Sequence, residues 1–169
     1  HILREADLNR CLSNIRKQSD FCDFSLCILV RILYFDYGDD VDSLQCYLDE
    51  IREAFRTFPF WPMSSLHPCN NGFCYWSESH LFMFLSTAHL YQQSVGITAS
   101  RETHILRASL RAKMPDGIGK GLYEVLSQVY LPYTLCAMLN LIDFSRDPEI
   151  TYMATEVANI IVYQLTLAT

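Results

Sequence analysis

Glycine and proline are scarce in this 169-residue chain, with six of each, and strand-like alternation of polar and apolar residues is nearly absent. Half of the residues are hydrophobic, which excludes a disordered or collagen-like chain. Apolar residues instead recur at helical spacing in almost every segment. We therefore predict an all-α fold of antiparallel helical hairpins, forming a single domain over residues 1–169.

Basic residues are also few in this chain. Thirteen basic residues stand against 19 acidic ones, and they are dispersed singly along the chain. A nucleic-acid surface needs a clustered cationic stripe, so nucleic acid is not an expected partner. The longest apolar run, near Leu26 to Phe35, contains Arg31 and is too short to cross a bilayer. We predict no membrane span.

Several catalytic motifs are missing. There is no G-x-S-x-G elbow and no cysteine at a recognisable strand-to-helix turn, so a serine or cysteine hydrolase is not supported. The glycines of residues 117–121 are too closely spaced for a phosphate-binding loop and follow no strand. We predict no cofactor.

Cysteine, in contrast, is frequent, with seven residues. Cys69 and Cys74 bound a compact loop and are expected to form a disulfide, which indicates an extracellular or secretory location. Zinc bound by this pair with His67 and His80 is the alternative, but no second pair of this type follows, so we predict no metal site. Four other cysteines are expected to be small buried hydrophobes: Cys11, Cys22, Cys27 and Cys136.

The hydrophobic period predicts seven helices, at residues 3–17, 22–37, 40–57, 78–93, 102–113, 132–144 and 149–167. The last one begins at Asp147-Pro148-Glu149, an acidic cap followed by proline at the first helical position. Residues 58–77 form a long connection rich in aromatic side chains, and loops of this length are typical of functional regions. The chain begins at His1 without a leader, so we expect a fragment of a longer protein.

Two stretches carry a resemblance to a known group of proteins. One is Tyr75-Trp76-Ser77-Glu78-Ser79-His80, followed by Tyr91-Gln92-Gln93, which is similar to an aromatic-x-x-Glu-Asn-His…Tyr-Leu-x-x-Gln pattern. The other runs from 121 to 130 and continues through 137–144. From Trp61 onward the chain resembles α/α-toroid proteins similar to heparinase-like and alginate-lyase-like polysaccharide lyases and to six-hairpin glycosidases. This resemblance implies that the chain forms part of an α/α toroid.

The candidate catalytic residues lie in these two stretches. With Ser77 as the N-cap, His80 falls at the third helical position, where the helix dipole favours a neutral imidazole that can act as a base. Glu124 lies among tyrosines in a stretch of few charges, which suits a carboxyl group at a cleft wall. The resemblance implies that Tyr123 or Tyr130 protonates a leaving glycosidic oxygen. Each of these residues has an equally simple structural interpretation as a buried or capping side chain.

Other residues are candidates for substrate binding. Aromatic rings stack on sugars, and arginine pairs with an acidic sugar's carboxylate. Glu78 is a possible second acid for a hydrolase, although a first-turn carboxylate is favoured by the helix dipole alone. The candidates are Trp61, Tyr75, Trp76, Glu78 and Arg111.

Two functions follow as hypotheses. The first is a carbohydrate-active segment, either lyase-like or glycosidase-like, that acts on an extracellular polysaccharide. The second is a non-catalytic structural or binding module of an extracellular assembly, and the replacement of the pattern's Asn by Ser79 favours it. In both, other segments of the same parent chain are expected partners, because an incomplete ring exposes apolar helix faces.

Overall fold

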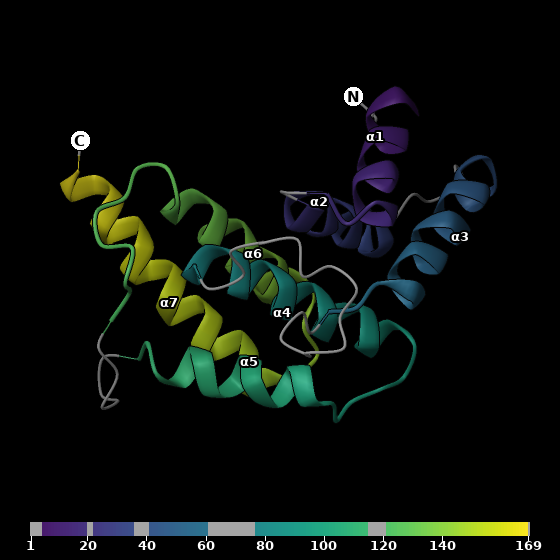
Figure 1. Cartoon of the computed structure of the whole chain (residues 1–169). Coiled ribbons are helices and arrows are strands. Elements are labelled where there is room, and N and C mark those ends of the chain that lie inside the picture. Colours follow the sequence, from purple (N-terminus) through teal and green to yellow (C-terminus); the bar gives the residue numbers. More distant parts are fainter. Residues whose placement is uncertain (1–4, 20–21, 36–40, 61–76, 115–120, 169) are drawn as a thin grey trace. The chain divides into compact units, whose positions relative to one another are not determined.

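The computed structural model of this chain describes residues 5–19, 22–35, 41–60, 77–114 and 121–168, with side chains from residue 45 onward in the third segment. These residues form seven α-helices and no strand, which confirms the prediction of an all-α chain (Figure 1). The chain divides into two compact units, residues 1–73 and 74–169. The expectation of a single domain stays a prediction.

The first unit contains α1 (Glu5–Arg16), α2 (Cys22–Tyr34) and α3 (Val41–Thr57), and each helix contacts the other two. Residues three and four apart share a face of a helix, so each amphipathic helix presents one apolar stripe to the others. On the surface, Arg16 pairs with Glu50 at 2.8 Å and joins α1 to α3. The stripes comprise Leu8, Leu12 and Ile15 on α1, Leu26, Leu29 and Val30 on α2, and Leu48, Ile51 and Phe55 on α3.

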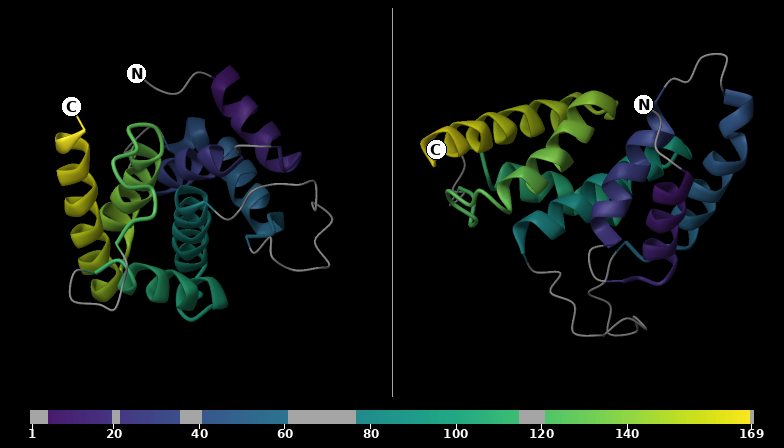
Figure 2. Two further views of the ribbon diagram at one scale, coloured as in Figure 1. Left: turned by 60° about the vertical axis from the view of Figure 1, so that its left-hand side comes forward. Right: turned by 90° about the horizontal axis from the view of Figure 1, so that it is seen from above.

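The second unit contains α4 (Glu78–Ser94), α5 (Arg101–Arg111), α6 (Leu131–Phe144) and α7 (Pro148–Leu167). Figure 2 shows α6 between α4 and α7, and α6 packs against both. Helix α5 contacts α4 and α7. The arrangement encloses α4, which is buried along most of its length. Polar side chains on α4 therefore need partners from the surrounding elements.

Two helix starts agree with their sequence signals. The Ser77 side chain accepts a hydrogen bond from the His80 N–H at 3.4 Å and caps α4, as predicted. Asp147 caps α7, with Pro148 at the first helical position. All seven predicted ranges coincide with helices, and their ends differ from the prediction by at most three residues, the largest difference being the end of α2 at Tyr34 in place of residue 37.

The contacts at the two ends of α4 set its direction relative to α6. The first residue of α4, Glu78, is bonded to the backbone at Tyr123, before α6 begins. Near the other end, the Gln93 amide donates to the carbonyl of Phe144, the last residue of α6, at 2.9 Å. The two helices therefore run side by side in the same direction, and residues 121–124 lie at the start of α4.

The cysteines of the described segments are free thiols. Cys22 and Cys27 are buried as expected and Cys11 is half-buried, but the prediction that Cys136 is buried was wrong. Cys136 lies on the side of α6 opposite the buried stripe that contains Ala137 and Met138. The predicted disulfide of Cys69 and Cys74 lies outside the described residues. None of the described helices combines the length and hydropathy needed to cross a bilayer.

Candidate functional site

The start of α4 places two predicted site residues, Glu78 and His80, in one turn. Because Ser77 is the N-cap, Glu78, Ser79 and His80 occupy the first three helical positions. Glu78 and Ser79 are buried, whereas His80 is half-buried. The unpaired N–H groups of this turn give it a partial positive charge, which favours a carboxylate and disfavours a protonated imidazole.

Glu78 is anchored on both of its carboxylate oxygens. Its Oε1 forms an ion pair with the ammonium of Lys113, and both side chains are buried. Its Oε2 accepts the N–H of Tyr123 at 2.9 Å and, at 3.5 Å, that of Glu124. Lys113 also donates to the carbonyl of Gly121 at 2.9 Å. Glu78 and Lys113 therefore hold residues 121–124 against the start of α4, which is a structural role.

Glu124 faces the same turn. Ser79 donates its hydroxyl to Glu124 Oε1 at 3.2 Å, while Oε2 is enclosed and has no hydrogen-bond partner in the described segments. Burial raises the pKa of Glu124, and the negative charge of Glu78 raises it further; the hydrogen bonds from Ser79 and the charge of His80 oppose this rise. The pKa of Glu124 thus stays above its usual value, and His80 is near enough to influence it.

The two candidate tyrosines are on the surface. The ring of Tyr123 lies 4.0 Å from the Lys113 ammonium and is 75% exposed, so it borders the Glu78–Glu124 cluster. Tyr130 is 49% exposed at the start of α6, where its N–H bonds to Ser127 at 3.1 Å. The structure thus brings together Glu78, His80, Tyr123 and Glu124 from the predicted set. Trp61, Tyr75 and Trp76 lie outside the described residues.

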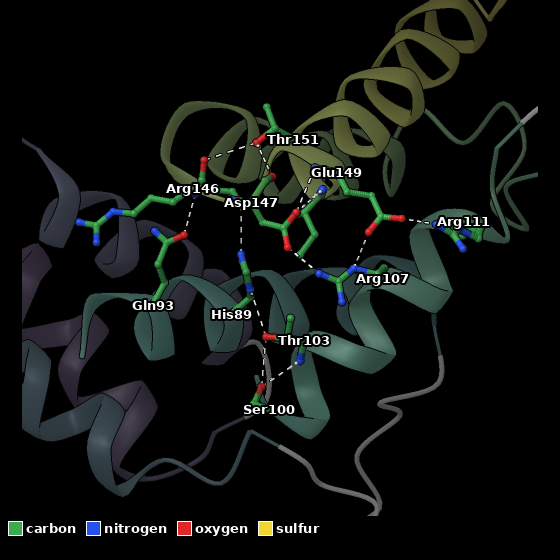
Figure 3. A network of polar contacts seen from close by, with 12 residues as sticks. His89, Gln93, Ser100, Thr103, Arg107, Arg111, Arg146, Asp147, Glu149 and Thr151 are labelled. Atoms are coloured by element: carbon green, nitrogen blue, oxygen red, sulfur yellow. Dashed lines mark hydrogen bonds and ion pairs between the residues drawn. The ribbon is translucent and has the colours of Figure 1, made fainter. Parts of the chain in front are cut away.

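A second polar cluster, centred on His89, was not predicted from the sequence (Figure 3). Its Nδ1 lies 3.1 Å from the Thr103 hydroxyl and its Nε2 lies 3.1 Å from the Ser145 hydroxyl. His89 therefore joins α4 to α5 and to the link between α6 and α7. Burial is the main cause of its lowered pKa; the guanidinium of Arg107 lowers it further and the carboxylate of Asp147 opposes both. The side chain is a buried, neutral connector.

Arg111, a predicted substrate-binding residue, belongs to an ion-pair network beside this cluster. Arg107 pairs with Asp147 at 2.5 Å and with Glu149 at 2.9 Å, and Arg111 also pairs with Glu149 (Figure 3). The pairs join α5 to the first turn of α7. The i, i+4 spacing of Arg107 and Arg111 places both side chains on one face of α5. It does not identify their partners, because Asp147 lies 40 residues after Arg107 and Glu149 lies 38 residues after Arg111.

Asp147 has two roles, and a pair of variants separates them. It accepts the N–H groups of Glu149 at 2.9 Å and Ile150 at 3.2 Å and it pairs with Arg107. We expect Asp147→Ala to lower the free energy of unfolding by about 1–2 kcal/mol, since both the cap and the ion pair are lost. Asp147→Asn keeps the cap and is expected to lose less than half as much. Urea denaturation measures both, and equal losses would contradict the capping role.

The described segments contain no group of three or more His, Cys, Asp or Glu side chains arranged to hold a metal ion. No protein-family model matches this chain, and neither a curated protein nor a solved structure is significantly similar to it.

Proposed function

We propose that this chain is a segment of an α/α toroid that acts on an extracellular polysaccharide, with His80 as its base, a tyrosine as its acid and Glu124 close to the base. The observation that carries the proposal is the meeting of half-buried His80 and Glu124 at the start of α4, beside the exposed ring of Tyr123. The positive end of the helix dipole favours the neutral form of the imidazole, which is the form that can accept a proton. Glu124 is close enough to His80 for the charge of one group to affect the protonation of the other.

A lyase reaction fits this cluster better than hydrolysis. A glycosidase needs two available carboxyl groups on either side of the scissile bond. Glu78 is engaged by Lys113 and by backbone N–H groups, so it is a poor second acid. In the lyase reaction His80 removes the proton next to the uronate carboxyl group, a carbon–carbon double bond forms as the glycosidic bond breaks, and a tyrosine protonates the leaving oxygen. Tyr123 is our candidate donor, with Tyr130 as the alternative.

The helix directions support the toroid part of the proposal. Helices α4 and α6 run in the same direction, while α7 returns along α6, because Gln128, just before α6, bonds to the Ala168 carbonyl at the end of α7. Successive hairpins of a toroid repeat this relationship. The resemblance of residues 75–80 and 121–144 to lyases of that fold supports the same interpretation.

The test is an assay of the chain on a panel of uronate polymers, following the ultraviolet absorbance of the unsaturated product. We expect product from the wild type and none above background from His80→Ala, which lacks the base. His104→Ala is the matched control, since His104 is an exposed histidine on α5 in the same unit. It should retain wild-type activity. If no polymer yields product with the wild type, the lyase proposal fails.

A non-catalytic module of an extracellular assembly is the second candidate, and one observation favours it. Residues 121–130 and the end of α7 expose large apolar side chains and are tied together by the Leu126 N–H, which bonds to the Gln164 amide oxygen at 3.3 Å. Apolar surface of this kind is typical of contacts with other protein segments. The side chains are Tyr123, Val125, Leu126, Val129, Val162, Tyr163 and Leu167. Binding of a uronate polymer without any product would favour this candidate.

A further inference from the structure

We infer that Ser79 and Glu78 are positioning residues for Glu124, with Ser79 holding its carboxyl group and Glu78 holding its backbone. The inference deepens the proposed function and rests on it where it concerns catalysis. Its structural part depends only on the contacts at the start of α4. Ser79 stands where the lyase-like pattern has asparagine, and in this chain its hydroxyl bonds to Glu124.

Ser79 selects one of the two carboxyl oxygens of Glu124. Its side chain is 1% exposed and donates to Oε1 at 3.2 Å. The enclosed Oε2 receives no such donor from the described residues. When Glu124 takes up a proton, Oε2 is therefore the favoured site, because Oε1 already accepts the serine hydroxyl. Ser79 thus orients the carboxyl group and distinguishes its two oxygens.

Glu78 fixes the segment that carries Glu124. Residues 121–124 precede α6 and belong to no helix. Within this segment, Glu78 accepts the N–H groups of Tyr123 and Glu124, and Lys113 donates to the Gly121 carbonyl. Gly121 has φ of +68°, a left-handed conformation that suits glycine. The buried Glu78–Lys113 pair therefore replaces the helical hydrogen bonds that this stretch lacks.

Ser79 and Glu78 act on the charge of Glu124 in opposite ways. A hydroxyl donor stabilises the ionised carboxylate, whereas the nearby negative charge of Glu78 destabilises it. The other titratable groups at this position are His80 on the same turn and Lys113, which is paired with Glu78. Loss of either positioning residue therefore shifts the same titration, and the two shifts have opposite signs.

The experiment measures the pKa of Glu124 by carbon NMR of the intact chain with labelled glutamate carboxyl groups, and Glu124→Gln assigns the signal. We expect Ser79→Ala to raise the pKa of Glu124 and Glu78→Gln to lower it. Ser86→Ala is the matched control, because Ser86 is a buried serine two turns along α4 whose hydroxyl donates to the Met83 carbonyl at 3.2 Å. It should leave the Glu124 titration unchanged.

An unchanged pKa in Ser79→Ala, in a variant with a wild-type circular dichroism spectrum, would overturn the positioning role of Ser79. If Glu78→Gln does not fold, the comparison of Ser79→Ala with Ser86→Ala still decides the inference. The failure of the proposed function is distinguishable. Opposite pKa shifts without product from any polymer would leave the positioning intact and remove the lyase, whereas product without pKa shifts would remove the positioning alone.

Discussion

Replacing Lys113 with methionine is expected to lower the free energy of unfolding by about 3–5 kcal/mol, the usual cost of leaving one partner of a buried ion pair unpaired. Methionine keeps the apolar length of the lysine stem, so the loss comes from the charge and not from a large cavity. The Glu78 carboxylate would remain buried at the start of α4 with no cation beside it. Urea denaturation followed by circular dichroism measures the change.

The double variant Lys113→Met, Glu78→Gln tests the cause. It removes both charges, and glutamine still offers an oxygen to the Tyr123 N–H. We therefore expect it to be more stable than Lys113→Met alone. The matched control is Arg16→Met in the first unit, since Arg16 pairs with Glu50 on the surface and exposed pairs contribute only about 0–1 kcal/mol. A loss under about 1 kcal/mol for Lys113→Met would contradict the buried-pair interpretation.

Acidification below pH 6.5 is expected to destabilise the chain through His89. An unfolded histidine takes up a proton near pH 6.5, whereas the pKa of His89 in the folded chain is lowered by burial. Below that pH the unfolded state binds more protons, so the free energy of unfolding falls as the pH falls, by up to about 1.4 kcal/mol per pH unit. The free energy of unfolding continues to fall until the pH reaches the pKa of His89 in the folded chain.

Other groups titrate nearby, so the measurement compares slopes between variants. The raised pKa of Glu124 has the opposite effect. In the folded chain Glu124 binds a proton above pH 4.5, where an unfolded glutamate does not, so this group raises the free energy of unfolding as the pH falls. Asp147 contributes only at lower pH. Its pKa is lowered in the folded chain, so its protonation there lowers the free energy of unfolding. We expect His89→Gln to flatten the decline between pH 7.5 and 5.5, and exposed His104→Gln to keep it. Equal slopes in wild type and His89→Gln would rule out His89 as the cause.

The sequence predicted several site residues but not the residues that they contact. His80 and Glu124 were predicted from the chemistry of their surroundings. Lys113 was not, because its importance comes from an ion pair with Glu78, which lies 35 positions earlier (113 − 78). His89 was missed because it lies within an apolar helix, where its polar partners Thr103 and Ser145 are 14 and 56 residues away. A single sequence without pairing information gives no sign of contacts at such separations.

The sequence by itself determined the seven helices and several of their ends, because hydrophobic period, a Ser or Asp cap and a following proline all act within a few neighbouring residues. Only the tertiary structure decided which polar groups meet. The parallel course of α4 and α6 brings Glu78 to residues 121–124, and the packing of α5 against α7 gives Arg111 a carboxylate partner. Burial then changed the chemistry: desolvation raised the pKa of Glu124 and lowered that of His89, and desolvation depends on what packs around a side chain.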